Sequence, residues 1–202
     1  VYLTMKKYLL KSVGFGTLLV LFTSCEKLPQ AEIDSANQAI ENTRVEAEMY
    51  APEEFLALQD SLQVALQLVE QEKSGLFPSF KNSKAKLVMI DSLAMQTQQV
   101  ALTKKEEMKA EVQAALLEVK TLLEENKTLI TAAPKGKEGA LALEQINQEL
   151  GVIETSVNEI SNEWQNGDYY NSKEKVVSVK EKASQINTEL KDELAKFNAR
   201  RG

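Results

Sequence analysis

The most constraining feature of this sequence is a long stretch without helix-breaking residues. Between Pro78 and Pro134 there is neither glycine nor proline, the two residues that most often interrupt a helix. Ala, Leu, Glu, Lys and Gln predominate across the chain, and such a composition favours long helices. The stretch that starts at residue 79 therefore predicts one continuous helix of roughly 50 residues, about 75 Å long at 1.5 Å per residue.

Apolar residues recur every three or four positions at both ends of this predicted helix, as they do on one face of a helix. The first stripe comprises Leu87, Ile90, Ala94 and Ala101, and the second comprises Val112, Leu116, Val119, Leu123 and Ile130. Residues 103–111 between the stripes are polar on nearly all sides, which is typical of a helix that bridges two packed regions through solvent. Asn126 falls on the second stripe, where a polar residue often fixes helix register or partner number.

Four further helices are predicted, over residues 31–49, 52–73, 137–165 and 168–197. Pro52 suits the first turn of its helix, Gly75 is expected to cap the end of that helix, and Asn166-Gly167 predicts a turn. The helix over residues 137–165 has the most regular stripe, with alternating steps of three and four as in a coiled-coil seam. This stripe comprises Leu143, Ile146, Leu150, Ile153, Val157, Ile160 and Trp164.

Two sequence features recur in the same order, which favours an internal repeat. Ala51-Pro52 and Ala133-Pro134 each separate two predicted helices, and Asn82-Ser83-Lys84 matches Asn171-Ser172-Lys173. Chance matches of this size also occur in low-complexity helical sequence, but the shared order of elements favours duplication of a three-helix unit. The third helix of the first unit would then continue directly as the first helix of the second unit.

The predicted fold class is therefore all-α and elongated, with two antiparallel, coiled-coil-like three-helix bundles that share the long central helix. Residues 31–104 are expected to form the first bundle and residues 105–202 the second. This layout resembles a spectrin-type array, and the likeness concerns architecture only. The alternative fold bends the long helix at residues 104–109 and collapses both units into one compact bundle, which would place apolar residues on outward faces.

The N-terminal residues have the pattern of a secretory signal peptide. Basic residues follow Met5, residues 13–22 are apolar, and the small residues Thr23 and Ser24 precede Cys25. The apolar run is too short for a spanning helix, which needs roughly 20 apolar residues. We expect residues 1–24 to be removed, with residues 1–4 an extension upstream of the start site.

The motif Phe22-Thr23-Ser24-Cys25, which contains the only cysteine, resembles the lipobox of bacterial lipoproteins. The resemblance implies acyl chains on Cys25, a short tether at residues 25–30 and a membrane of the cell envelope as partner. Glu26 follows the cysteine, where Asp would favour the inner membrane, so the expected location is the outer membrane facing the periplasm, with the cell surface also open. The alternatives are an ordinary signal peptide with an unrelated cysteine and an N-terminal membrane anchor.

The segment Tyr50-Ala51-Pro52-Glu53 resembles a motif in a helical domain of unknown function found in bacterial cell-envelope lipoproteins. In that domain an Ala-rich helix ends in the same four residues and a second helix follows. The resemblance covers the first predicted unit. It implies helical form and an envelope location, and it brings no known chemistry.

Composition argues against several function classes. Removal of residues 1–24 takes away three lysines and no acid, so 21 of the 24 Lys and Arg remain against 30 Asp and Glu, a net charge of −9. An acidic chain repels nucleic acid, so no nucleic-acid partner is expected. The chain has no histidine, the commonest general base and metal ligand. We therefore expect no enzyme activity, metal, cofactor or small-molecule substrate.

Paired carboxylates are the only candidates for catalysis in the sequence. They occur at Glu53/Glu54, Glu106/Glu107 and Glu124/Glu125. A catalytic pair would need a desolvated cleft that shifts the pKa of one member. On helix surfaces such pairs are solvated charges, and this is the interpretation that we adopt.

Aromatic residues gather at the turn between the last two predicted helices: Trp164, Tyr169 and Tyr170. They would either cap the end of the bundle or form a docking patch for another envelope protein, because aromatic residues concentrate at binding hot spots. We expect this tip to face away from the membrane. The expected function is that of a lipid-anchored, non-enzymatic tether, spacer or protein-binding adaptor. The alternative is a periplasmic chaperone-like protein that binds apolar polypeptides between its helices.

Overall fold

The computed structural model describes residues 26–133 and 137–199, and all regular structure within these ranges is helical. The helices are α1 (Gln30–Tyr50), α2 (Pro52–Lys73), α3 (Lys81–Ala132), α4 (Lys137–Gln165) and α5 (Tyr169–Ala199). The bounds predicted for α2 and α4 are correct, and those of α1, α3 and α5 differ by one or two residues at each end. The predicted fold class, two three-helix bundles that share a long central helix, is confirmed.

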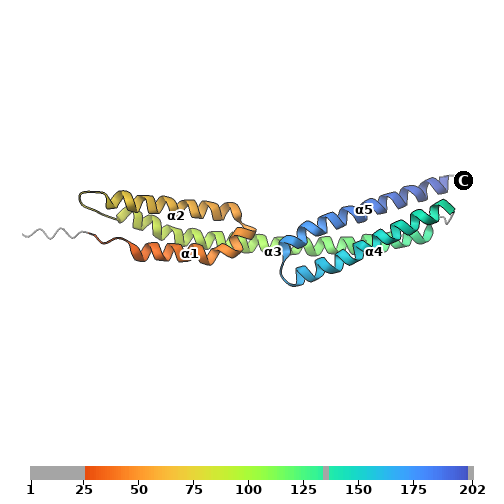
Figure 1. Cartoon of the computed structure of the whole chain (residues 1–202), viewed down its shortest axis with the longest axis horizontal. Coiled ribbons are helices and arrows are strands. Elements are labelled where there is room, and N and C mark those ends of the chain that lie inside the picture. The colour runs from red at the N-terminus through yellow and green to blue at the C-terminus, as the bar shows by residue number, and fades with distance from the viewer. Residues whose placement is uncertain (1–25, 134–136, 200–202) are drawn as a thin grey trace, which may run out of the picture.

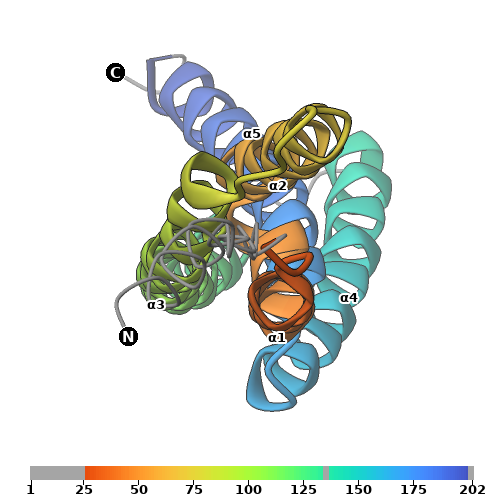
Figure 2. The same ribbon diagram turned by 90° about the vertical axis from the view of Figure 1, so that its left-hand side faces the viewer.

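The molecule is a rod, and α3 runs along its whole length (Figure 1). Helices α1 and α2 pack along the first half of α3, while α4 and α5 pack along its second half. Viewed along the axis, α1, α2 and α3 surround a common centre (Figure 2). The 52 residues of α3 span about 78 Å at 1.5 Å per residue. The compact alternative is wrong, because α3 continues without a break through residues 104–109.

Each bundle has its own hydrophobic core, and no buried residue of the described ranges belongs to both. The first core comprises Ala36, Ile40, Ala47, Tyr50, Ala51, Phe55, Leu58, Ala65, Val69, Phe80, Leu87, Ile90, Ala94 and Ala101. The second comprises Val112, Leu116, Val119, Leu123, Leu150, Ile153, Val157, Ile160, Val176, Val179, Ala183, Ile186 and Leu190. Burial of each large side chain stabilises its own bundle by about 1.5–3 kcal/mol.

Helix α5 buries the same face of the repeated motif as the first half of α3. The buried positions correspond at a constant offset of 89 residues, the spacing between Ser83 and Ser172. The matched buried pairs are Ser83/Ser172, Leu87/Val176, Ile90/Val179, Ala94/Ala183, Thr97/Ile186 and Ala101/Leu190. The two segments therefore have equivalent positions in their bundles, as the sequence repeat predicts.

A carboxylate from α2 caps the start of α3. Glu72 accepts hydrogen bonds from the backbone N–H groups of Asn82 and Ser83, at 3.3 and 3.2 Å. These groups belong to the first turn of α3, where N–H groups have no partner within the helix. Burial raises the pKa of the Glu72 carboxyl, but the hydrogen bonds from Ser83 and Asn82 outweigh it and hold the pKa below its ordinary value.

The α2–α3 and α4–α5 turns are built differently. At the α4–α5 turn, Gly167 has a φ of +86°, a left-handed conformation that favours glycine. The cap expected at Gly75 does not take this form, because Gly75 has no positive φ. Helix α2 ends instead with the N–H of Ser74 bonded to the carbonyl of Glu70 at 3.2 Å.

Candidate functional site

The N-terminal end of the rod holds the first described residue, Glu26, in a fixed position. Its carboxylate accepts hydrogen bonds from the Lys84 ammonium at 2.8 Å and from the backbone N–H of Phe80 at 3.0 Å. The Lys84 bond and then the Phe80 bond lower the pKa of Glu26. Pro29, three residues further on, is fully buried. The chain is therefore tied to the start of α3 immediately after position 25, and Cys25 itself lies outside the described residues.

No helix in the described part of the chain combines the length and the apolar character that crossing a membrane requires. The same residues contain no group of three or more His, Cys, Asp and Glu side chains placed to hold a metal ion.

The structure brings Trp164 and Tyr169 together, with ring centroids 6.3 Å apart. The indole N–H of Trp164 donates a hydrogen bond to the backbone carbonyl of Lys109 on α3, at 3.1 Å. The Lys109 ammonium lies over the Tyr169 ring, 6.0 Å from its centroid. Tyr170, the next residue, is 46% exposed. Trp164 and Tyr169 thus fasten the α4–α5 turn to α3, while Tyr170 faces solvent.

The expectation that this turn is the distal tip of the rod is wrong. The turn lies at the middle of the rod, beside α3 and near the junction of the two bundles (Figure 1). The reason is the direction of α3, which runs away from the N-terminal end. Helix α4 must therefore return along α3 toward the N-terminal end, and the turn that follows α4 lies near the centre of the rod. The far end consists of the end of α3, the start of α4 and the end of α5.

The polar middle of α3 is held by side chains of the first bundle. Lys104 pairs with Glu54 of α2 and Lys105 pairs with Glu46 of α1, both at 2.9 Å. The Lys105 ammonium also lies 5.6 Å from the centroid of the buried Tyr50 ring. The Glu46 hydrogen bond raises the pKa of Lys105, and burial raises the pKa of Tyr50.

The second bundle also contacts this segment, since Glu111 pairs with Lys173 of α5 at 2.6 Å. None of residues 102–111 is buried, in keeping with the expected polar link between two packed regions. These ion pairs are partly exposed, so each stabilises the junction only weakly.

Asn126 lies on the apolar stripe as predicted and is fully buried. Its side-chain N–H donates to the backbone carbonyl of Ala183 at 2.9 Å, and its side-chain carbonyl accepts from Asn187 at 2.8 Å. Sequence reasoning missed Asn187, because it lies beside Ile186 and off the narrow stripe of α5. The core of a three-helix bundle is wider than a two-helix seam, and a search for a second polar residue beside the stripe would have found it.

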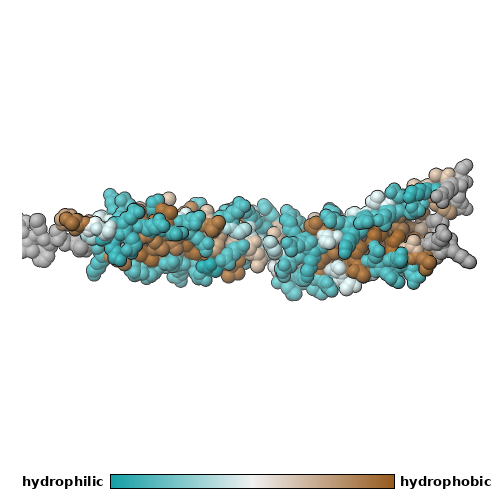
Figure 3. Space-filling view, turned by 45° about the horizontal axis from the view of Figure 1, so that its top comes forward, coloured by the Kyte–Doolittle hydropathy of each residue, from teal (hydrophilic) through white to brown (hydrophobic). Residues whose placement is uncertain are grey.

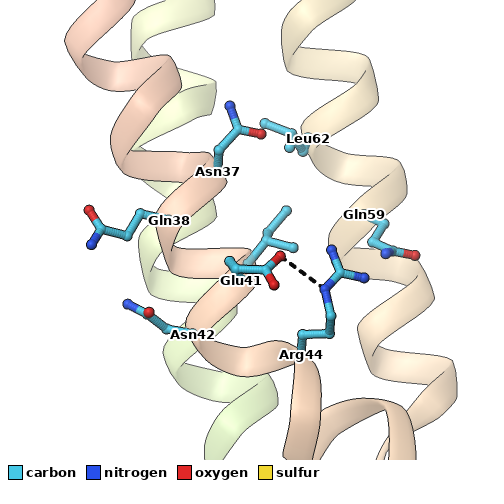
Figure 4. Close-up of a pocket in the computed structure, with 8 residues that line it drawn as sticks. Asn37, Gln38, Glu41, Asn42, Arg44, Gln59 and Leu62 are labelled. Atoms are coloured by element: carbon cyan, nitrogen blue, oxygen red, sulfur yellow. Dashed lines mark hydrogen bonds and ion pairs between the residues drawn. The ribbon is translucent and has the colours of Figure 1, made fainter.

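A groove of about 610 Å³ lies between α1 and α2 (Figure 4). Its lining is Asn37, Gln38, Ile40, Glu41, Asn42, Arg44, Gln59 and Leu62. Arg44, the one cation among them, bonds to Glu41 at 2.9 Å and to Glu48 at 3.0 Å, and lies over the Phe55 ring. The two carboxylates thus neutralise the charge of Arg44 within the fold. The side-chain amides that line the groove offer neither a general base nor a nucleophile.

The acidic pairs that were candidates for catalysis contribute members to surface ion pairs. Glu54 pairs with Lys104, Glu106 with Lys109, Glu124 with Lys127 and Glu125 with Lys191. The pKa of Glu54 and that of Glu125 are lowered chiefly by hydrogen bonds from their lysine partners. A general acid at neutral pH needs a raised carboxyl pKa, which is the opposite shift.

A second groove, of about 490 Å³, lies between α4 and α5 at the far end of the rod. Its apolar lining includes Leu143, Ile146, Leu190, Leu194 and Phe197. Most of these side chains are only half-buried, and Glu189 and Asp192 lie at the same groove. Sequence reasoning missed this groove because it assigned all stripe residues to the core.

Comparisons with known proteins place this chain in no family. No protein-family model matches it, and neither do curated proteins or solved structures.

Proposed function

We propose that this protein is a lipid-anchored, non-enzymatic spacer of the bacterial cell envelope that can also serve as a tether or adaptor. The observation that carries the proposal is the position of Glu26. This residue follows Cys25 and is bonded to the start of α3, the helix that runs the length of the rod. An anchor on Cys25 would therefore attach one end of the rod to a membrane and leave the other end about 78 Å away, the length of 52 helical residues.

The short connection between anchor and rod supports the spacer function. Pro29 is fully buried and α1 begins at Gln30, so no flexible linker separates position 25 from the first bundle. A long flexible linker would let the rod lie in any orientation, whereas a short one limits its tilt. Several acyl chains are needed for stable attachment, as a single chain binds only reversibly. The outer membrane, with the rod facing the periplasm, is the location that we propose.

An adaptor needs a surface for a second envelope protein, and the rod offers two. One is the distal groove between α4 and α5, with apolar walls and acidic residues beside them. The other is at the middle of the rod, where a groove of about 540 Å³ is lined by Trp164 and the exposed Leu117, and where Tyr170 of the α4–α5 turn is exposed outside the groove. Trp164 and Tyr169 already have partners within the fold, so Tyr170 and Leu117 are the side chains free to contact a partner.

Replacement of Cys25 tests the anchor. We expect Cys25→Ser to release the protein from membranes or to stop its processing, because serine has no thiol to carry an acyl chain. The measurements are membrane fractionation and mass spectrometry of the N-terminal peptide. A Cys25→Ser variant that is processed normally and stays in the membrane fraction would refute the proposal.

The distal groove supports a second candidate function, that of a periplasmic chaperone-like binder of apolar polypeptides. Leu143, Ile146 and Phe197 are half-buried there and could contact an unfolded client. Such a binder would enhance the fluorescence of a hydrophobic dye and slow the aggregation of a denatured protein, and a spacer would do neither. Phe197→Ser should abolish both effects if the groove is responsible.

A further inference from the structure

The loop between α2 and α3 exposes two neighbouring apolar side chains, Leu76 and Phe77. Leu76 is 92% exposed, more than any other large hydrophobic side chain in the described ranges, and Phe77 is 74% exposed. Phe80 in the same loop is 2% exposed and belongs to the first core. The loop can therefore deliver an apolar side chain to the core, yet it leaves these two in solvent.

This loop lies at the N-terminal end of the rod, beside the first described residues (Figure 1). The bonds of Glu26 to the Phe80 N–H and to Lys84 join the loop and the start of α3 to the residue that follows Cys25. Leu28, which is 41% exposed, adds a third apolar side chain near this end. Hydrophobic atoms are visible at this end of the molecular surface in Figure 3.

The charges around the loop differ from the acidic balance of the whole chain. Lysines flank the loop on both sides, at Lys73 and Lys81, and Lys27 follows Glu26. The nearby acids are engaged within the fold, since Glu26 binds Lys84 and Glu72 caps α3. Lys73 pairs with Glu70 at 3.4 Å, so Lys27 and Lys81 are the flanking cations with no ion pair to another described residue. An apolar tip flanked by lysines is the chemistry of segments that bind at a phospholipid interface, where the headgroup phosphates attract the cations.

We infer that Leu76 and Phe77 insert into the membrane interface beside the anchor, so that the α2–α3 loop is a second contact between the rod and the bilayer. The inference rests on the proposed acylation of Cys25, which would bring this end of the rod to a phospholipid surface. Two separate contacts, the acyl chains and the loop, would restrict the tilt of the rod further than the acyl chains and the short connection to α1 would do alone.

An environment-sensitive dye tests the inference in the full lipidated protein. Leu76→Cys introduces the one thiol that acylation of Cys25 leaves reactive, and a nitrobenzoxadiazole dye is attached to it. The labelled protein is placed in vesicles of phosphatidylethanolamine and phosphatidylglycerol, with and without lipids that carry a nitroxide quencher. We expect the emission at position 76 to shift to shorter wavelength in vesicles and to lose intensity with the quencher. Addition of Phe77→Asp should reverse both effects, because a charged side chain opposes insertion.

The matched control is Leu141→Cys with the same dye. Leu141 is also exposed, at 69%, and belongs to the start of α4 at the far end of the rod. Its emission should neither shift nor be quenched. If both positions give the aqueous signal while the acylated protein remains with the vesicles, the loop does not insert and the inference is overturned. If mass spectrometry finds no acyl chain on Cys25 and the protein leaves the vesicles, the anchoring proposal fails and the inference fails with it.

Discussion

The side-chain N–H of Asn187 donates a hydrogen bond to the side-chain carbonyl of Asn126, 2.8 Å away within the second bundle. Both residues are buried, and the bond joins α5 to α3. Asn126 also donates to the carbonyl of Ala183, one turn earlier on α5. Buried polar groups need partners, so a shift of α5 along α3 would leave these groups unsatisfied. The pair therefore selects one register of α5.

We predict that Asn126→Leu lowers the free energy of unfolding by about 1–3 kcal/mol, because it removes the buried acceptor of the Asn187 amide and the buried donor to the Ala183 carbonyl. The double variant Asn126→Leu/Asn187→Leu should cost less than the single one, since apolar replacement of both partners removes the unsatisfied group. Urea unfolding followed by circular dichroism measures both. Asn162→Leu, at an exposed position on α4, is the control. A double variant that loses more than the single one would contradict this account.

The two bundles should unfold separately when one core is disrupted. Leu150→Asp places a charge in the second core, at a cost of about 4 kcal/mol or more, and should unfold α4, α5 and the second half of α3. The first bundle should keep most of its structure, because its core shares no buried residue with the second. Hydrogen exchange resolved by peptide measures this. Leu58→Asp is the matched variant in the first core and should give the opposite pattern, whereas loss of protection along the whole rod would contradict independence.

Continuity of α3 determines the length of the rod. Small-angle scattering should give the mature protein a maximum dimension above about 78 Å, the length of 52 residues at 1.5 Å each. Proline within a helix costs about 3 kcal/mol and kinks it, so Lys105→Pro should shorten this dimension. Lys105→Ala removes the ion pair with Glu46 but keeps the helix, and it should leave the dimension unchanged. An unchanged dimension in the proline variant would show that α3 does not maintain the rod.

Stability should be constant between pH 5 and 8 and should fall in acid. Hydrogen bonds from lysines lower the pKa values of Glu26, Glu54 and Glu125 below the ordinary 4.5. A carboxyl with a lowered pKa stabilises the fold above its unfolded pKa, and this contribution is lost as the pH falls through the folded pKa. Lys105 and Lys127 have pKa values raised above 10.5, chiefly by glutamate partners, so their contribution is complete below that pH.

The measurement is the free energy of unfolding in urea from pH 3 to pH 8. Glu26→Gln should reduce the acid dependence at the N-terminal end of the rod. The Phe80 N–H should then be less protected from hydrogen exchange, and its protection factor should no longer change with pH. Because the chain has no histidine, a steep change between pH 5 and 8 would require a strongly perturbed group that these contacts do not explain.

Much of the fold could be predicted because the relevant signals are local. Pro52 and the Asn166-Gly167 turn mark helix ends, and the bounds of α2 and α4 follow from them. The start of α3 could not be placed to the residue, because its cap is a carboxylate from another helix, Glu72. The bond between Glu26 and Lys84 joins positions 58 residues apart and leaves no local pattern.

The candidate sites were less predictable than the helices. Periodicity correctly identifies Trp164 as the last residue of the apolar stripe of α4. Its position at the middle of the rod depends instead on the direction in which α4 runs along α3. The exposure of Leu76 and Phe77 also could not be predicted. The sequence indicates a turn there, but it does not indicate which side chains of the turn reach the core. Such features depend on how the helices pack together, which periodicity does not report.

The shared helix also sets the azimuth of one bundle relative to the other. Each residue of an α-helix turns the chain by about 100° and advances it by 1.5 Å. Deletion of a single residue within 104–109 would therefore swing the distal groove about a quarter of the way around the axis, without altering the composition of either core. The number of residues between the two stripes of α3 thus determines the angle between the two bundles about the rod axis. That angle determines which side of the molecule the distal groove faces.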